Sequence, residues 1–323
     1  MLNLLDALIE KLECPQHLKK DLANLIPKEN APLLLLALNR WVNPAEAAAQ
    51  LKIDEAKVKE EAERLYKQGF MEHEKGSYKT KPLGSILYSV LAIEQVELPD
   101  QSRQALSDLG LKLKKEKYEN YINEGSLLYA ASVKTLHEAS SFHRHPHEGT
   151  TFVVPTDDAA KVLEKASLRV LVPCSCRLTF QKCSKPLMTC ILLNESAADC
   201  LNRGFGEKLS MEQSLEILKI AAEASLVHLA VYNLSGPYGL CSCCSCCCYD
   251  LQILRQNRPG WIEKAKYRAE DDKDLCNNCG ICAEVCSFQA RSMDSDHLSY
   301  EPAKCYGCGV CVVKCPTDAI SLR

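Results

Sequence analysis

The fold of residues 270–323 is decided by two cysteine runs, Cys276-Asn-Asn-Cys279-Gly-Ile-Cys282-Ala-Glu-Val-Cys286 and Cys305-Tyr-Gly-Cys308-Gly-Val-Cys311-Val-Val-Lys-Cys315. Each run has the spacing C-x2-C-x2-C-x3-C, and Pro316 follows the second. An iron–sulfur cubane needs four thiolates that converge on one small volume, and a tight loop with cysteines at i, i+3 and i+6 supplies three of them. Zinc sites typically pair two C-x2-C units across a long spacer instead. The runs therefore predict iron–sulfur clusters.

This stretch resembles the two-cluster ferredoxins of bacteria, in which the last cysteine of each run ligates the other cluster. The resemblance implies two [4Fe-4S] clusters. The implied ligands are Cys276, Cys279, Cys282 and Cys315 for cluster 1, and Cys305, Cys308, Cys311 and Cys286 for cluster 2. Gly280 and Gly309 each follow the second cysteine of a run, where a missing Cβ lets backbone N–H groups approach sulfur. Ser287 stands where the second run has Pro316, which leaves the ligand count intact.

Length and composition limit the possible fold class and compartment of the whole chain. With 323 residues, 46% of them hydrophobic, we expect an α+β protein of several domains with sizeable cores. The first residues, MLNLLDALIEKLECP, lack a basic segment and a cleavage site, and no run is long enough to span a bilayer. We therefore expect a cytoplasmic protein without membrane insertion. Twenty cysteines in that compartment indicate metal binding rather than disulfides.

Residues 1–85 predict a helical domain. Apolar spacing predicts helices near the N-terminus, over 32–41 and over 44–49, and Asp54 is a good N-cap for a helix that runs to Gln68. Two short strands over 70–73 and 78–81 flank Lys75-Gly76-Ser77 and are predicted to form a hairpin. This order is similar to a winged helix-turn-helix domain, which would present the 54–68 helix to DNA.

The charges of that helix argue against DNA binding. Its basic residues are outnumbered by acidic ones, so the phosphate attraction that dominates DNA affinity is missing. The basic residues are Lys57, Lys59, Arg64 and Lys67, and the acidic ones are Asp54, Glu55, Glu60, Glu61 and Glu63. The net charge of −3 also shows no overall basic charge that would attract nucleic acid. A docking or scaffold role is favoured, and DNA is not an expected partner.

Residues 86–149 are predicted to form a helical connector. It ends in alternating histidines, His143, His145 and His147, which would share one side of an extended strand. A metal site is one interpretation, but without a second ligand segment a polar surface loop is favoured.

Residues 150–268, called the middle region below, predict a small α/β domain. Strands over 151–154 and 168–172 flank a helix over 157–165, which indicates a parallel βαβ unit. A helix over 211–224, with Ser210 and Gln213 as a capping box, precedes a strand over 226–234. The carboxyl ends of parallel strands share one edge of a sheet, so the segment at Cys174 should face the cysteine-rich loop that begins at Cys241. We expect one large thiolate pocket.

The candidate metal ligands of this pocket outnumber those of any single zinc site. They are Cys174, Cys176, Cys183, Cys190, Cys241, Cys243, Cys244, Cys246, Cys247 and Cys248, with Cys200 nearby. They predict at least one additional iron–sulfur cluster, either two cubanes or a larger cluster. The alternative is that some are buried small hydrophobic residues.

Residues 150–323 as a whole resemble uncharacterised proteins of anaerobes that join a C-x-C-R segment and a cysteine-packed segment to a terminal two-cluster ferredoxin module. The C-x-C-R segment is Cys174-Ser-Cys176-Arg177. Arg177 can offset cluster charge, clamp an anionic substrate or form a surface ion pair. His228 is interpreted as a core histidine.

Three functions remain open. The favoured one is an electron-transfer protein whose C-terminal clusters connect a redox partner to a middle-region centre. Residues 269–323, called the ferredoxin region below, carry nine acidic and five basic residues from Glu270 onward, which suits a partner with a basic docking surface. The second is an iron–sulfur reductase, which would make the chain an oxidoreductase with its active site in the middle region. The third is a redox-sensing DNA-binding regulator.

Overall fold

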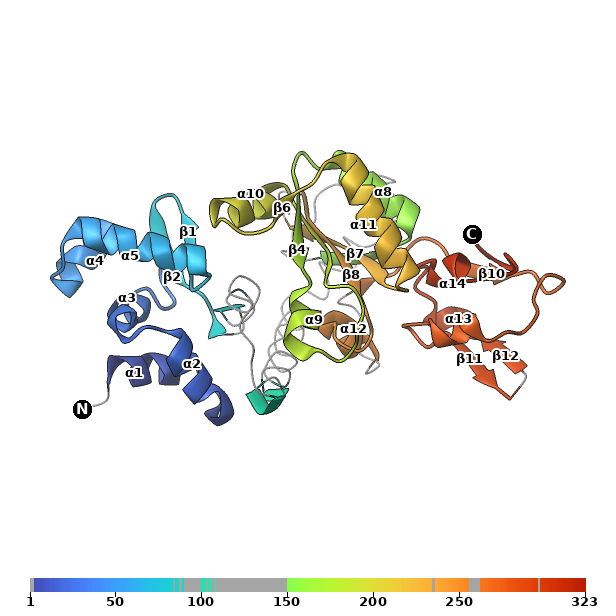
Figure 1. Ribbon diagram of the computed structural model, residues 1–323, viewed down its shortest axis with the longest axis horizontal. Helices are drawn as coiled ribbons and strands as arrows, with labels where there is room; N and C mark the ends of the chain where they lie inside the picture. The colour runs from blue at the N-terminus through green and yellow to red at the C-terminus, as the bar shows by residue number, and fades with distance from the viewer. Residues whose placement is uncertain are drawn as a thin grey trace, which may run out of the picture. The chain divides into compact units, whose positions relative to one another are not determined.

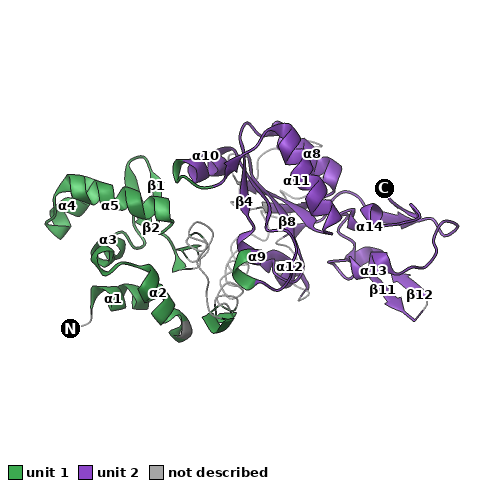
Figure 2. Ribbon diagram, viewed as in Figure 1, with its two compact units in different colours: residues 1–113, 178–180, 202–205 green, residues 114–177, 181–201, 206–323 purple. Residues whose placement is uncertain are grey.

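The computed structural model describes residues 3–83, 150–233, 236–255, 262–295 and 297–323, with single positions at 85, 86, 89, 100–102, 104, 105 and 108. Two compact units divide the chain (Figure 2). Unit 1 holds residues 1–113, 178–180 and 202–205, and unit 2 holds 114–177, 181–201 and 206–323. Apart from those single positions, the predicted connector lies outside the described residues, as do its three histidines. The predicted domain boundaries at 85, 149 and 268 stay a prediction.

The N-terminal unit consists of short helices followed by a hairpin (Figure 1). Its elements are α1 (Leu4–Lys11), η1 (Gln16–Leu18), α2 (Lys19–Leu25), η2 (Lys28–Asn30), α3 (Ala31–Leu36), α4 (Pro44–Leu51), α5 (Glu55–Gln68), β1 (Met71–Glu74) and β2 (Ser77–Thr80). The Asp54 carboxylate accepts a hydrogen bond from the Lys57 N–H at 3.2 Å, and Gly69 ends α5 with a φ of 94°. These are the caps that the sequence predicts.

One predicted helix is too long. The sequence predicts a helix over 32–41, but α3 ends at Leu36. The following residues pair with the hairpin, because Val42 and Tyr78 exchange two backbone hydrogen bonds of 2.9 and 2.8 Å. Local periodicity cannot reveal this tertiary pairing. The assignment of the unit to the winged-helix class stays a prediction.

The middle region is built on a seven-stranded sheet of order β6-β4-β5-β8-β7-β3-β9. Its strands are β3 (Thr150–Val154), β4 (Arg169–Pro173), β5 (Met188–Leu193), β6 (Glu207–Lys208), β7 (Val227–Asn233), β8 (Gly236–Cys243) and β9 (Ile262–Glu263). Its helices are α8 (Thr156–Lys165), α9 (Ser175–Phe180), α10 (Asn194–Asn202), α11 (Met211–Glu223) and α12 (Tyr249–Arg255). Ser210 and Gln213 form the predicted capping box of α11.

The first two strands of the predicted βαβ unit lie in one sheet but are not neighbours. β3 and β4 share the sheet, but β7, β8 and β5 lie between them. They still run in the same direction, because the four pairings that connect them are all antiparallel. Neither β5 nor β8 is predicted from the sequence. The segment Gly-Pro-Tyr-Gly-Leu-Cys-Ser-Cys of β8 has no β-branched residue, so its strand conformation depends on pairing with β7 rather than on propensity.

The two faces of this sheet have different neighbours. One face places residues such as Ile191, Ala230 and Leu240 in a hydrophobic core with residues of α8, and α11 lies beside that helix (Figure 1). The other face places Val153 and Leu229 in a core with residues of the ferredoxin region. The sheet therefore separates a helix-covered side from a side that meets the ferredoxin region.

The ferredoxin region contains two small antiparallel sheets and two short helices. Its elements are β10 (Ala269–Asp271), α13 (Ile281–Glu284), β11 (Arg291–Asp294), β12 (His297–Tyr300), η3 (Pro302–Lys304), α14 (Val310–Val313) and β13 (Ile320–Leu322). β10 pairs with β13, and β11 pairs with β12. In the described part of the chain, no helix is both long enough and apolar enough to cross a bilayer.

Candidate metal centres

Two cavities of the ferredoxin region collect its eight cysteines. The first cavity is lined by Cys276, Cys279, Cys282 and Cys315. The second cavity is lined by Cys286, Cys305, Cys308 and Cys311. Each cavity thus takes three cysteines from one run and one from the other, which is the grouping expected from the resemblance to two-cluster ferredoxins.

The surroundings of the cysteines fit iron–sulfur clusters. Backbone N–H groups donate to sulfur, from Ala290 to the Cys286 Sγ at 3.3 Å and from Gly307 to the Cys305 Sγ at 3.4 Å. Gly307 has a φ of 69°, and a Cβ there would lie 2.3 Å from the Tyr267 carbonyl oxygen. Such donors stabilise ligating thiolates. The sequence analysis singled out Gly280 and Gly309 for this approach and missed Gly307, whose only signal is its position between two cysteines of one run.

Arg291 is a buried cation that lines both cavities. Its guanidinium binds the Asp271 carboxylate through two contacts of 2.5 and 2.9 Å, and its Nη1 lies 3.9 Å from the Cys282 Sγ. Burial alone would lower the pKa of this guanidinium, but the hydrogen bond to Asp271 and the neighbouring thiols raise it, so Arg291 stays charged. The sequence analysis counted it only as one of five basic residues.

Six cysteines of the middle region form a closed ring of thiols, called the six-thiol group below. In order around the ring they are Cys174, Cys176, Cys248, Cys243, Cys241 and Cys190, and each shares side-chain hydrogen bonds with its two neighbours. They come together because β4 ends, β5 begins and β8 ends at one edge of the sheet. The predicted approach of Cys174 to the segment at Cys241 therefore occurs, although β5 lies between β4 and β8 and is antiparallel to both.

The direction of the pKa shift alternates from one thiol to the next around the ring. Hydrogen bonds from neighbouring thiols lower the pKa of Cys174, Cys241 and Cys248. The same bonds, together with burial, raise the pKa of Cys176, Cys190 and Cys243. The three thiols with a lowered pKa ionise most readily, and metal ligation requires the thiolate. The ring is therefore suited to hold a metal centre.

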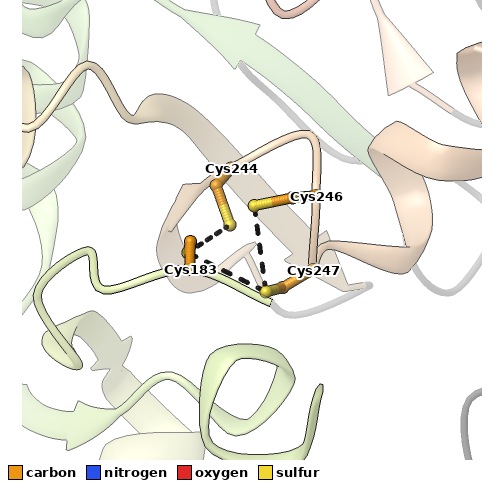
Figure 3. Close-up of side chains that lie close together, drawn as sticks. All are labelled: Cys183, Cys244, Cys246 and Cys247. Atoms are coloured by element: carbon orange, nitrogen blue, oxygen red, sulfur yellow. Dashed lines mark hydrogen bonds between the residues drawn. The ribbon is translucent and has the colours of Figure 1, made fainter. Parts of the chain in front are cut away.

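Four other cysteines form a second, tighter cluster, called the four-thiol group below (Figure 3). The Sγ atoms of Cys183, Cys244, Cys246 and Cys247 all lie within 4.8 Å of one another. Cys183 comes from the segment between α9 and β5, and the other three come from the turn between β8 and α12. The single large pocket that the sequence predicts is thus divided into two groups. The division arises because the alternating strand positions of β8 end at Cys243, after which the turn carries its cysteines elsewhere. Cys200, in α10, belongs to neither group.

Arg177 lies beside both groups and is only 1% exposed. Its Nη1 donates to the Ser242 carbonyl oxygen at 2.8 Å, and its Nη2 donates to the Thr189 hydroxyl. Burial would lower the pKa of the guanidinium, but the charges of Cys174 and Cys190 and a hydrogen bond to Cys244 raise it. The interpretation as a surface ion pair is therefore wrong, because the side chain is buried and faces thiols. Its position fits the interpretation that it offsets thiolate charge.

His228 occupies the core position that the sequence predicts. It is 2% exposed, its Nδ1 lies 3.2 Å from the Ser242 hydroxyl, and burial lowers its pKa to about 4. Its strand neighbours Val154 and Ala230 belong to the core on the helix-covered face. Since side chains alternate along a strand, His228 lies on the face opposite Cys241 and Cys243.

Comparison with family models identifies the C-terminal part of the chain. Residues 275–319 match the family model of the 4Fe-4S dicluster domain. This part is therefore a dicluster ferredoxin domain, as the sequence predicts, and the chain carries an iron–sulfur electron-transfer module.

The curated relatives match a similarly short part of the chain, 16–18% of its length. A ferredoxin of Pyrobaculum islandicum is 41% identical over 63 residues, which are 18% of this chain and 57% of that protein. An archaeal-type glutamate synthase [NADPH] of Thermotoga maritima is 37% identical over 60 residues, 18% of this chain and 12% of the enzyme. An uncharacterised ferredoxin of Methanocaldococcus jannaschii is 29% identical over 56 residues, 16% of this chain and 73% of that protein. The chain thus spans about an eighth of the glutamate synthase and just over half of the first ferredoxin. No solved structure matches it.

Proposed function

We propose that the chain is an electron-transfer protein that connects a redox partner to an additional iron–sulfur centre held by the six-thiol group. The proposed ligands of the two ferredoxin clusters are the four cysteines of the first cavity and the four of the second. The observation that carries the proposal is a shared hydrophobic cluster. Cys243 and Cys248 of the six-thiol group pack in it with Cys286 and Cys308 of the second cavity.

Two aromatic residues of the shared hydrophobic cluster support close contact between the sites. Phe288 and Tyr306 stack with ring centroids 4.5 Å apart, belong to the shared cluster and line the second cavity. They exclude water from this contact, and burial is one of the protein's controls on cluster potential. When bound, iron–sulfur clusters supply one-electron transfer over a wide range of potentials.

Exposed residues near the first cavity suit the docking of a redox partner. Cys279 of the first cavity is exposed, and so is the neighbouring Leu275, at 51%. Asp272 and Asp274 are exposed close by in the sequence. An exposed apolar residue among acidic ones supports docking of a partner with a basic surface, because charge complementarity steers such encounters. The first cavity would then receive the partner, and the second would face the middle region.

The test is acid-labile sulfide per chain in full-length protein purified without oxygen. Two cubanes account for about eight sulfides, so we expect a clear excess over eight. Cys243→Ser should bring the value down towards about eight and leave the electron paramagnetic resonance signals of the two ferredoxin clusters in place. About eight sulfides in the unmodified protein would overturn the proposed middle-region centre.

A reductase with its active site at the six-thiol group is a second candidate. It is favoured by the number of thiols, since six exceed the four that one cubane takes, and by Arg177, whose buried Nε has no hydrogen-bond partner among the described residues. A small anionic ligand that changes only the spectrum of the centre removed by Cys243→Ser would support this candidate. A spectrum insensitive to such ligands would favour the carrier.

A further inference from the structure

The four-thiol group has the dimensions of a site for one metal ion. The Cys183 Sγ lies 3.8 Å from the Cys244 Sγ and 3.9 Å from the Cys247 Sγ, and the Sγ atoms of Cys246 and Cys247 are also 3.9 Å apart (Figure 3). Four sulfurs placed tetrahedrally at about 2.3 Å from a central ion are about 3.8 Å from one another. Three of the six separations thus match the edges of a tetrathiolate tetrahedron, and the other three are at most 4.8 Å.

The same distances do not suit a cubane. Each thiolate of a cubane binds a different iron atom, so the four sulfurs surround a core of eight atoms and stand farther apart than around one ion. All four Sγ atoms of this group lie within 4.8 Å of one another. In the ferredoxin region, by contrast, the cysteines line cavities that also include residues such as Ile281 and Tyr300.

Neighbouring groups compensate the negative charge of such a site. Four thiolates around a divalent ion carry two negative charges, and Arg177 hydrogen-bonds to Cys244. Backbone N–H groups of Lys182 and Cys247 hydrogen-bond to the sulfurs of Cys247 and Cys244. Hydrogen bonds of this kind accompany thiolate ligands. Cys244 and Cys247 are buried, while Cys183 and Cys246 are partly exposed and give an ion access.

We propose that Cys183, Cys244, Cys246 and Cys247 bind a single tetrahedral divalent metal ion, Zn²⁺ or Fe²⁺, in a site separate from every iron–sulfur cluster of the chain. Its role is structural. The turn that supplies three of the ligands lies directly between Cys243 and Cys248, which belong to the six-thiol group. An ion bound here fixes this turn to the segment at Cys183.

The test compares metal and sulfide in full-length Cys183→Ser and in unmodified protein, both purified without oxygen. A single-ion site contains metal but no inorganic sulfide, so the variant should lose one zinc or one iron per chain while sulfide stays unchanged. Which metal falls tells zinc from iron. The matched control is Cys14→Ala, a buried cysteine of the N-terminal unit, which should lose neither. Equal losses of iron and sulfide, or no loss of metal, would overturn the proposal.

A second measurement covers the case in which Cys183→Ser does not fold. Unmodified protein produced in cobalt-supplemented medium should bind one Co²⁺ per chain, because Co²⁺ accepts the same tetrahedral thiolate ligands. Its intense thiolate-to-cobalt absorption should appear without a change in sulfide, and failure to take up cobalt would refute the site. The electron-transfer proposal is tested separately, by the loss of sulfide in Cys243→Ser.

Discussion

The ferredoxin region and the middle region gather their cysteines in different ways. Each cavity of the ferredoxin region takes three cysteines from one short run, whereas the six-thiol group draws on the start of α9, on β5, on β8 and on the residue before α12. In the ferredoxin region, backbone N–H groups of Ala290 and Gly307 donate to sulfur. In the middle region, thiols contact thiols. The first kind of site is encoded locally, and the second depends on the sheet.

The largest expected effect breaks one local site. Cys308→Ala removes a cysteine of the second cavity, and we expect a loss of about four irons and four sulfides per chain, because a cubane needs all four thiolates. Iron and sulfide analysis with electron paramagnetic resonance measures this. Cys14→Ala is the control that should keep both. Unchanged iron and an unchanged reduced-state spectrum in Cys308→Ala would refute the ligand assignment.

A smaller effect should follow from backbone strain at the same cavity. In Gly307→Ala the new Cβ meets the Tyr267 carbonyl oxygen at 2.3 Å, and the φ of 69° is unfavourable for alanine. We expect a loss of about 2–4 kcal/mol in unfolding free energy and a lower iron content, both measured on anaerobic samples by thermal unfolding and iron analysis.

Gly76→Ala is the matched control for that variant. Gly76 has a similar φ of 79°, but a Cβ there meets nothing within 4 Å. Only the conformational cost of about 1 kcal/mol should remain, with iron content unchanged. Equal effects of the two substitutions would mean that the approach of Gly307 to Tyr267 is unimportant.

The smallest effect concerns electrostatics. Arg291→Gln removes a buried positive charge beside both cavities and leaves Asp271 without its partner. Both changes disfavour the more negative, reduced state, so the reduction potentials should fall by on the order of 50 mV, which is about 1 kcal/mol. A redox titration followed by electron paramagnetic resonance measures the shift. Arg291→Lys keeps the charge and should show a smaller shift, and a rise in potential in Arg291→Gln would contradict this account.

Local signals in the sequence predict local structure well. Asp54 and Gly69 bound α5, and Ser210 with Gln213 begins α11, because caps act within one turn. The spacing of the C-terminal runs predicts the dicluster domain that residues 275–319 match. In each of these cases, residues that determine the structure are close together in the sequence.

The missed features depend on residues far apart in the sequence. β8 contains no β-branched residue, and its strand conformation depends on pairing with β7 and β5. The burial of Arg177 depends on Ser242 and Thr189, which lie on two other segments. The division of the cysteines into six and four follows from where β8 ends, which composition does not reveal. One usable signal existed, since Cys241 and Cys243 alternate and Cys244 breaks the alternation.

The exchange of one cysteine between the two cavities has a consequence for the order of events during synthesis. The first cavity is lined by Cys276, Cys279 and Cys282 but also by Cys315, which the ribosome adds long after them. The second cavity needs Cys286 from the earlier run. Neither set of four is complete in a nascent chain that stops between the runs. With the proposed ligand sets, delivery of iron and sulfide to either cavity would follow translation of the whole segment, and a chain truncated between the runs would retain neither set.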